Sequence, residues 1–344
     1  MKIAFYLNVI SPHQLPLARE VVKRIGGENF RYVYAEDFLA DRKAMGWNDA
    51  DIPQWCVKGY ESSPELMEAD LVYTGIRCPG LIARRSAAGK KTAYYSERWF
   101  KPIPVLGMLL PGWLRMLYPA YRKMARQMVE LLDNPMVKYL PCGPWAAKDM
   151  QRIGVQKSQF LPWGYFVAPG MCQTGRTASG ECLRVLWAGK ISQLKRVDTI
   201  VKAVKYAGKG IELTIVGGGP DRAKIEKMAV GLPIHILPSQ PIMRIREMMR
   251  GHDVYVFASN DMDGWGAVVN EALEEGMYVI GTRDTGASAA MLPDNALFSA
   301  GDYRGLARLL KHCMAQKKVG VLKGQGIGEW TASAAADRLL GLMR

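Results

Sequence analysis

The feature that most constrains the fold of this chain is an alternation of short apolar runs with amphipathic helical patterns along nearly its whole length. The runs are rich in β-branched and aromatic residues, which is typical of strands buried in a parallel sheet. The predicted strands are Lys2–Val9, Phe30–Glu36, Asp70–Thr74, Lys91–Tyr95, Val137–Leu140, Phe160–Trp163, Leu183–Ala188, Ile211–Val216, Ile234–Leu237, Val254–Ala258, Tyr278–Gly281 and Ala296–Ser299. The predicted helices are Leu15–Ile25, Leu81–Ala88, Pro144–Ile153, Val197–Tyr206, Pro220–Met228, Met243–Arg250, Ala267–Glu275, Tyr303–Gln316 and Ala332–Met343. This alternation predicts an α/β fold of doubly wound parallel sheets.

The length of 344 residues exceeds the size at which one hydrophobic core usually stops growing, so two domains are expected. Between Val167 and Glu181 the sequence becomes rich in Gly, Ser and Thr and loses its apolar rhythm. We therefore predict Rossmann-like domains at residues 1–166 and 182–328, joined by a linker at residues 167–181. The two domains are expected to face a cleft, because ligands bind outside the carboxyl ends of parallel strands.

The composition excludes several classes of protein. A content of 49% hydrophobic and 23% charged residues is that of a globular chain and not of a disordered one. The six cysteines are spaced singly, which argues against a zinc site and a disulfide framework, so we expect reduced thiols. Neither a signal peptide nor an apolar run of the ~18 residues needed for a membrane span is visible. The net charge of +14 predicts an anionic partner, namely nucleic acid, an acidic membrane surface or a phosphorylated ligand.

The segment from Asp263 to Leu273 is the most informative for function, because it follows a predicted strand and opens a predicted helix. Gly264 and Gly266 let the backbone approach a ligand closely, and the start of a helix offers N–H groups that suit a diphosphate. The carboxylates of Asp263 and Glu271 can accept hydrogen bonds from sugar and ribose hydroxyls. The alternative is an ordinary glycine-containing loop followed by a solvated glutamate.

Two further strand-to-helix loops favour phosphate binding. After the predicted strand Leu183–Ala188, Lys190 and Lys195 could neutralise a diphosphate leaving group. After the strand Ile211–Val216, three glycines precede Pro220, a residue suited to the start of a helix. Each loop alone is a weak signal, but the three motifs in this order and spacing are a stronger one.

Together, the motifs from Arg184 to Leu273 resemble the C-terminal domain of retaining GT-B glycosyltransferases of family 4 (group 1), a family that includes enzymes of bacterial surface-polysaccharide synthesis. The resemblance rests on a loop with two spaced basic residues, a Val-Gly-x-Gly-Pro turn and two carboxylates eight positions apart. It implies two Rossmann-like domains facing a cleft. It also implies that residues 329–344, which begin near Trp330-Thr331, form a C-terminal helix that crosses back to the first domain.

The resemblance assigns roles to individual residues. Lys190 and Lys195 would bind the donor diphosphate, Glu271 the ribose, and the loop at Leu237–Gln240 the edge of the base. Asp263 would contact the donor sugar together with the backbone of Gly264–Gly266. The donor-binding residues predicted in this way are Gly189, Lys190, Lys195, Gly217, Gly218, Ser239, Gly264, Trp265, Gly266 and Glu271.

The sequence departs from the family pattern at two of these positions. Lys190 stands where the family usually has Arg, which keeps the charge but loses the bidentate fork. Asp263 replaces the first Glu of the motif and is shorter by one methylene. Both changes bear on the recognition of the donor more than on the fold.

The N-terminal half contains two candidate catalytic residues. The stretch His13-Gln14-Leu15-Pro16 resembles the opening of some surface-polysaccharide transferases, which would place His13 near the donor phosphates or the acceptor. The alternative for His13 is a structural hydrogen bond at the entry of a helix. Glu97 stands roughly where many family members carry a His, so we expect it to orient the acceptor. The alternative for Glu97 is an ion pair with Arg98.

The expected reaction is a retaining transfer of a hexose from a nucleoside-diphosphate sugar. The sequence shows no convincing nucleophile, which is compatible with the same-face mechanism that the resemblance implies. UDP is the default base and GDP the alternative, and the nucleotide sugar is a donor substrate and not a resident cofactor. No metal site is predicted, since lysines facing the diphosphate would make a divalent ion unnecessary.

The excess positive charge is concentrated between Arg98 and Val129, where no acidic residue occurs. Tryptophan, leucine and methionine are interleaved with the basic residues, a pattern that suits a segment lying in an anionic membrane interface. We therefore predict a cytoplasmic enzyme that binds the inner leaflet of the plasma membrane through the Arg98–Arg126 region, beside a lipid-linked or glycan acceptor. The alternative is a core helix with a solvated basic face.

Three other functions are compatible with these observations. A sugar-nucleotide 2-epimerase uses the same two-domain fold, but the spaced lysines and carboxylates fit a transferase better. A nucleic-acid-binding protein would explain the charge, although the main basic cluster contains aliphatic residues where a stacking platform would be expected. An inactive member of the glycosyltransferase family is the third alternative, because of Asp263.

Overall fold

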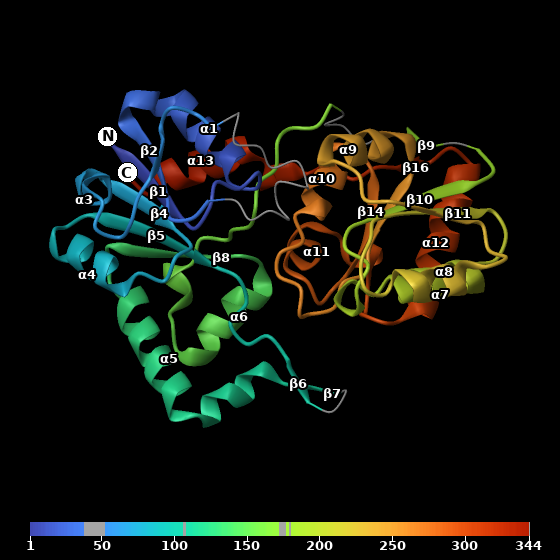
Figure 1. Ribbon diagram of the computed structural model, residues 1–344, viewed down its shortest axis with the longest axis horizontal. Helices are drawn as coiled ribbons and strands as arrows, with labels where there is room; N and C mark the ends of the chain where they lie inside the picture. Colours follow the sequence, from blue (N-terminus) through green and yellow to red (C-terminus); the bar gives the residue numbers. More distant parts are fainter. Residues whose placement is uncertain (38–51, 106–107, 172–176, 179, 344) are drawn as a thin grey trace. The chain divides into compact units, whose positions relative to one another are not determined.

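The computed structural model describes residues 1–37, 52–105, 108–171, 177–178 and 180–343, and the chain divides into two compact units (Figure 1). Unit 1 comprises Met1–Ala168 together with Glu329–Arg344, and unit 2 comprises Pro169–Gly328. Each unit has its own cluster of buried apolar side chains.

Unit 1 is built on a six-stranded sheet with the order β3-β2-β1-β4-β5-β8, in which all neighbouring strands are parallel. Every residue of β1 and β4 is buried, as expected for central strands covered on both faces by helices. The strands are β1 (Ile3–Leu7), β2 (Phe30–Tyr34), β3 (Cys56–Lys58), β4 (Leu71–Thr74), β5 (Lys91–Ser96) and β8 (Val137–Pro141).

Proline begins four of the helices that the structure describes in unit 1, because its fixed φ and missing N–H suit the first helical turn. These helices are α3 (Pro64–Glu68), α4 (Pro79–Ala87), α5 (Pro119–Leu132) and α6 (Pro144–Ile153). The unit also contains α1 (Leu15–Ile25), the short 3-10 helix η3 (Gly112–Leu117), a hairpin of β6 (Ile103–Val105) with β7 (Met108–Leu110), and α13 (Ala332–Gly341).

Helix α13 returns from the end of the chain to unit 1 and lies beside α1 (Figure 1). The guanidinium of Arg24 in α1 bonds both carboxylate oxygens of Asp337 and the backbone carbonyl of Ser333. The ammonium of Lys91 in β5 donates a hydrogen bond to the carbonyl of Leu342 at 2.6 Å. Unit 1 is therefore assembled from two segments that lie far apart in the sequence.

Unit 2 repeats the arrangement with a parallel sheet of order β12-β11-β10-β13-β14-β15. Its strands are β10 (Leu183–Ala188), β11 (Ile211–Val216), β12 (Ile234–Leu237), β13 (Val254–Phe257), β14 (Tyr278–Thr282) and β15 (Leu297–Phe298). Its helices are α7 (Val197–Ala207), α8 (Arg222–Ala229), α9 (Ile242–Gly251), α10 (Val268–Glu274), α11 (Gly286–Met291) and α12 (Tyr303–Lys318). The apolar faces of α7 and α12 pack on β10 and β11 in the core of the unit.

The prediction of an α/β fold with two parallel sheets is confirmed. The predicted strand Phe160–Trp163 is wrong, because the structure shows only isolated bridges from Phe160 to Tyr139 and from Trp163 to Cys142. Pro162 lies between the two bridges and has no N–H to donate to a ladder. Part of the predicted linker forms β9 (Thr177–Ala178), which pairs with β16 (Leu322–Lys323). The five cysteines that the structure describes are free, and Cys172 lies outside the described residues.

Arg85 is a buried cation that ties α4 to the sheet of unit 1. Its side chain is fully buried, and its guanidinium donates hydrogen bonds to the carbonyls of Leu66, Ala69, Asp70 and Lys91. Burial lowers the pKa of this guanidinium to about 10. The contacts are mostly with backbone acceptors, which links the strand ends to the helix.

Replacement of Arg85 with methionine is expected to lower the free energy of unfolding by about 3 kcal/mol, because several buried carbonyls lose their donor. Urea unfolding of the variant measures this change. Arg84→Met is the matched control, since Arg84 is an exposed neighbour whose ion pair with Glu61 spans 3.6 Å and should contribute less than about 1 kcal/mol. Equal losses in the two variants would contradict the role given to Arg85.

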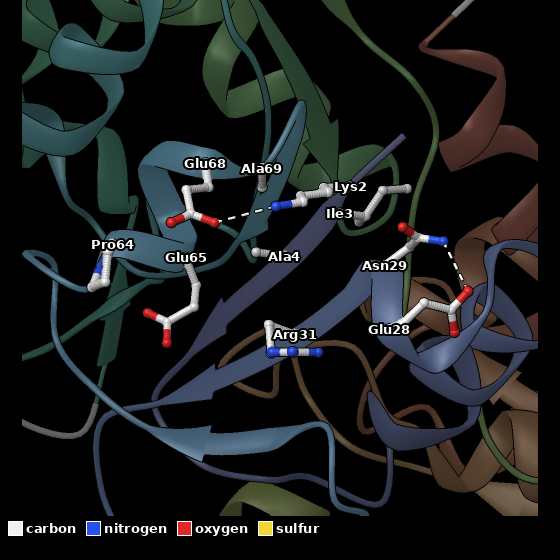
Figure 2. Close-up of a pocket in the computed structure, with 10 residues that line it drawn as sticks. All are labelled: Lys2, Ile3, Ala4, Glu28, Asn29, Arg31, Pro64, Glu65, Glu68 and Ala69. Carbon is white, nitrogen blue, oxygen red and sulfur yellow. Dashed lines mark hydrogen bonds and ion pairs between the residues drawn. The ribbon is translucent and has the colours of Figure 1, made fainter.

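A pocket of about 260 Å³ lies at the amino ends of β1 and β2, as Figure 2 shows. Charged side chains of both signs line it, and Lys2 forms an ion pair with Glu68 at 3.3 Å across one side. The pocket therefore lies at the opposite edge of the sheet from His13 and Glu97, which follow the carboxyl ends of β1 and β5. Ligands of parallel α/β sheets bind at the carboxyl ends, so we do not assign the reaction to this pocket.

Candidate functional site

The glycine loops after β10 and β11 are in direct backbone contact in unit 2. The N–H of Gly189 donates to the carbonyl of Val216 at 3.0 Å, and the N–H of Ile191 donates to that of Gly218 at 2.8 Å. A Cβ atom at Gly217 would stand 1.9 Å from the carbonyl oxygen of Gly189. Glycine is therefore required at position 217 by the close approach of the two loops, and the sequence-predicted Gly189, Gly217 and Gly218 come together.

The loop after β12 joins the same cluster. The N–H of Gly217 donates to the carbonyl of Leu237 at 3.1 Å, and the Ser239 hydroxyl lies 3.5 Å from where a Cβ of Gly218 would be. The guanidinium of Arg222 at the start of α8 bonds the carbonyls of both Gly217 and Leu237. The predicted base-binding loop at Leu237–Gln240 is thus hydrogen-bonded to the glycine loop after β11, which is one of the loops predicted to bind phosphate.

Lys195 connects the loop after β10 with the loop after β13. Its ammonium lies 2.5 Å from the carboxylate of Asp263, and the N–H of Asn260 donates to the carbonyl of Leu194 at 3.1 Å. Lys190, in the same loop as Lys195, is exposed. Two residues predicted to meet different parts of the donor are therefore paired with each other.

The Gly264–Gly266 turn leads into α10, and the side chain of Trp265 in this turn is directed into the core. Trp265 is buried, and its indole N–H donates to the Asn270 side chain at 2.8 Å, so only its backbone can reach a ligand. Gly266 has a φ of +91°, and a Cβ there would stand 2.5 Å from the ring of Phe257. Both constraints explain why this turn needs glycine next to tryptophan.

Glu271 is a buried carboxyl group in the first turn of α10. Only 6% of the residue is exposed, and burial raises its pKa to about 7 although Arg246 opposes this shift. Within the described part of the chain, no group donates a hydrogen bond to this carboxylate. The carboxylates of Glu271 and Asp263 both raise the pKa of the buried Tyr255, after burial itself, so the two lie near the same hydroxyl. A buried carboxylate with unused acceptor capacity can bind a pair of hydroxyls.

In unit 1, Tyr165 brings His13 and Glu97 together. The hydroxyl of Tyr165 donates to Glu97 Oε1 at 2.8 Å, and its ring stacks on that of His13 with centroids 6.1 Å apart. Lys101 donates to the other oxygen of Glu97 at 3.4 Å. Arg98, the partner considered for Glu97, lies 3.7 Å from Asp149. A carboxylate held in this way can orient a hydroxyl group but is already hydrogen-bonded on both oxygens.

Sequence reasoning gave no role to Tyr165, Arg222 or Asn270. Tyr165 lies two residues after the predicted strand Phe160–Trp163, but nothing in the local sequence reveals its contact with Glu97, which lies 68 residues away in the sequence. Arg222 follows the Gly-Pro turn after β11 at the start of a helix, so its position was a usable signal. Asn270 adjoins Glu271 and could have been examined as its neighbour.

Metal and cofactor binding stay at the level of prediction. Among residues 1–37, 52–105, 108–171, 177–178 and 180–343, no three His, Cys, Asp or Glu side chains are grouped in a way that would hold a metal ion.

Comparisons with known proteins give a family for unit 2 and a fold for the chain. A family model described as glycosyl transferases group 1 matches residues 178–319. The chain is similar in structure to the galactosyltransferase WaaB of the lipopolysaccharide outer core, with a TM-score of 0.67 and 13% identity over 100% of this chain and 99% of that one. No curated protein matches the sequence.

Two further solved structures have the same fold. HepE of Anabaena, in complex with UDP, gives a TM-score of 0.64 and 13% identity over 99% of this chain and 97% of that one. WaaG, a glycosyltransferase involved in lipopolysaccharide biosynthesis, gives 0.56 and 16% identity over 97% and 95%. These findings confirm the resemblance seen in the sequence: residues 178–319 match the model of group 1 glycosyltransferases, and the chain has the GT-B fold.

Proposed function

We propose that the protein transfers a hexose from a UDP-sugar, with retention of configuration, to a lipid-linked or glycan acceptor of a bacterial surface polysaccharide. The observation that carries the proposal is the buried carboxyl group of Glu271, which lies near Tyr255 and the end of β10, where the loops after β10, β11 and β12 are hydrogen-bonded to one another. HepE binds UDP and, in another crystal, UDP-glucose, which supports UDP over GDP for this chain. WaaB and WaaG act in lipopolysaccharide synthesis, which supports a glycan or lipid-linked acceptor.

The residues divide the work according to their chemistry. Lys190 and Lys195 supply positive charge for the diphosphate, which becomes more negative as the sugar leaves. Glu271 accepts hydrogen bonds from the ribose hydroxyls, and Asp263 with the Gly264–Gly266 backbone holds the donor sugar. His13 and Glu97 orient the acceptor hydroxyl. Its oxygen bonds the anomeric carbon on the same face from which the sugar–phosphate bond breaks, and its proton passes to the leaving phosphate. We infer that no metal ion takes part, since the lysines already stabilise the leaving group.

A thermal-shift panel of UDP, GDP, ADP and CMP, each with common sugar esters, tests the donor assignment. UDP and one UDP-sugar should raise the melting temperature by several degrees at millimolar concentration, without added divalent ions. A larger rise in melting temperature with GDP than with UDP would mean that the donor is a GDP-sugar. No shift with any nucleotide would overturn the proposed transfer reaction, and a shift that requires magnesium would overturn metal independence.

We also propose that η3 and α5 attach the enzyme to an anionic membrane surface. In η3, Trp113 and Leu117 are 43% and 70% exposed, and Tyr118 follows at 65%. Helix α5 buries Ala125, Met128 and Leu132 in unit 1 and exposes Arg122, Lys123 and Arg126. The core-helix alternative thus describes the inner face of α5, whereas η3 and the outer face of α5 combine apolar and basic groups as an interfacial segment does. No helix in the described part of the chain is both long and apolar enough to cross a membrane.

Replacement of Trp113 and Leu117 with serine is expected to reduce binding to vesicles containing phosphatidylglycerol by about tenfold or more. The reason is that each large apolar side chain loses roughly 1.5–3 kcal/mol of burial. Sedimentation with vesicles measures the bound fraction. The matched control replaces Val319 and Val321, which are 71% and 61% exposed in unit 2, with serine. A bound fraction that does not depend on the anionic lipid, or that is unchanged in the Trp113 and Leu117 variant, would exclude this attachment.

A further inference from the structure

The ion pair between Lys195 and Asp263 joins the two loops that are proposed to meet the diphosphate and the donor sugar. Lys195 Nζ lies 2.5 Å from Asp263 Oδ2, and the side chains are only 26% and 15% exposed. The other carboxylate oxygen, Oδ1, accepts a hydrogen bond from the N–H of Gly264 at 3.1 Å. Both oxygens of Asp263 are therefore engaged, and the loop itself holds the carboxylate beside the lysine.

This pairing changes what Lys195 offers to a phosphate group. The ammonium keeps its charge and two further N–H donors, but the adjacent carboxylate offsets part of the attraction that a nearby anion experiences. Because the pair is partly shielded from water, a nearby phosphate would interact with both members more strongly than at an exposed site. Asp263 therefore repels the anion that Lys195 attracts.

The repulsion distinguishes the donor from the product of the reaction. In a nucleotide sugar the terminal phosphate is esterified and carries one negative charge. After transfer the bond to the sugar is broken and the terminal phosphate of UDP gains a second ionisation, which for phosphate monoesters has a pKa of about 6. At neutral pH the product therefore carries roughly one more negative charge at the position nearest Lys195.

We propose that Asp263 is a specificity-determining residue that weakens the binding of the nucleoside diphosphate product relative to the nucleotide-sugar donor. This role rests on the proposed function of the donor site and adds to the contact of Asp263 with the sugar. One oxygen of the carboxylate contacts Lys195, and the other accepts a hydrogen bond from the Gly264 N–H.

The test compares UDP with its β-methyl ester, which has the charge of the donor but no sugar to contact. Both are titrated calorimetrically at low salt into wild type, Asp263→Asn and Asp263→Glu. In Asp263→Asn the Kd of the ester should fall about threefold and that of UDP about tenfold, because the second charge doubles the Coulomb energy. At pH 5.5, where the terminal phosphate of UDP is largely protonated, the two ligands should respond alike.

Two controls separate charge from structure. Asp263→Glu keeps the charge, so it should not show the selective gain of UDP over the ester that is expected for Asp263→Asn. Glu247→Gln removes an exposed carboxylate of α9 that pairs with Arg244, and it should leave both affinities unchanged. Asp263→Asn that weakens UDP, or that affects UDP and the ester equally at pH 7.5, would overturn the proposal.

The failure of this inference can be told apart from the failure of the proposed function. If wild type binds neither ligand, or if Lys195→Met and Glu271→Ala bind UDP as wild type does, the donor site itself is wrong. If those two variants lose UDP while Asp263→Asn shows no selective gain, the donor site stands and only the role of Asp263 is overturned.

Discussion

Glu271→Ala is expected to weaken UDP binding by about 100-fold. The carboxylate is buried and accepts no hydrogen bond from the described residues, so two ribose hydroxyls would satisfy both of its oxygens. A hydrogen bond to a charged group contributes about 1.5–3 kcal/mol, and two such bonds lost correspond to a factor of this size or more. Calorimetric titration of UDP measures the effect.

The same group predicts how nucleotide binding depends on pH. Burial raises the pKa of Glu271 to about 7, and only the ionised form accepts from both hydroxyls. UDP affinity should therefore rise between pH 6 and pH 8 as Glu271 ionises, with a proton released on binding at the lower pH. Glu271→Gln should show weak binding without this component of the pH dependence.

Stability should move in the opposite direction in the ligand-free protein. Folding raises the pKa of Glu271 from its usual 4.5 to about 7, so its protonated form is favoured by the fold. Its contribution is present below about pH 4.5 and is lost as the pH rises to 7. At pH 8 Glu271→Gln should therefore melt several degrees above wild type while binding UDP poorly. A variant that is less stable and also binds poorly would indicate a structural role instead.

Lys195→Met is expected to lower the rate of donor cleavage by roughly 1,000-fold. In the proposed function the ammonium binds the leaving diphosphate, and the loss of one preorganised electrostatic group of this kind typically costs about 2.7–4 kcal/mol of transition-state stabilisation. The variant also leaves the Asp263 carboxylate without its cation, which adds repulsion toward the phosphate. UDP release from the UDP-sugar identified by the thermal-shift panel, with water as acceptor, measures the rate.

Lys205→Met is the matched control for this experiment. Lys205 is an exposed lysine in the last turn of α7, so the change removes the same charge from the same unit at a position away from the loops. Its rate should stay within about twofold of wild type. A Lys195→Met enzyme that keeps a tenth of the activity or more would mean that Lys190 or backbone groups carry the stabilisation.

Three strands of unit 2 could be predicted closely because apolar residues predominate or alternate along them and glycine or proline follows each one. The predicted ranges of β10, β11 and β12 agree with the observed ones. Where a single residue breaks the pattern, as Pro162 does, the run of apolar residues was misleading. Helix α5 was obscured in another way, since its basic residues drew the interpretation toward charge and away from helical periodicity.

The parts of the site that lie within one loop could also be predicted, because glycine and lysine spacing is a local property. The pairings between loops could not. Lys195 meets Asp263 only because β10 and β13 are neighbours in the sheet, and Glu97 meets Tyr165 across an equal distance in the sequence. Strand order depends on how the whole unit packs. The sequence therefore identifies both residues of each pair as candidates but does not show that they are in contact.

The position of α13 has a consequence for how the protein is made. Unit 1 includes the last residues of the chain, where Asp337 and Leu342 bond Arg24 and Lys91. During synthesis the first segment of unit 1 leaves the ribosome before unit 2, but α13 cannot join it until its own residues, Ala332–Gly341, have been synthesised. Unit 2 is a continuous stretch of the sequence, so it can fold while unit 1 still lacks α13. Synthesis of unit 1 therefore begins before that of unit 2 but is completed after it. A chain truncated before α13 lacks a helix of unit 1.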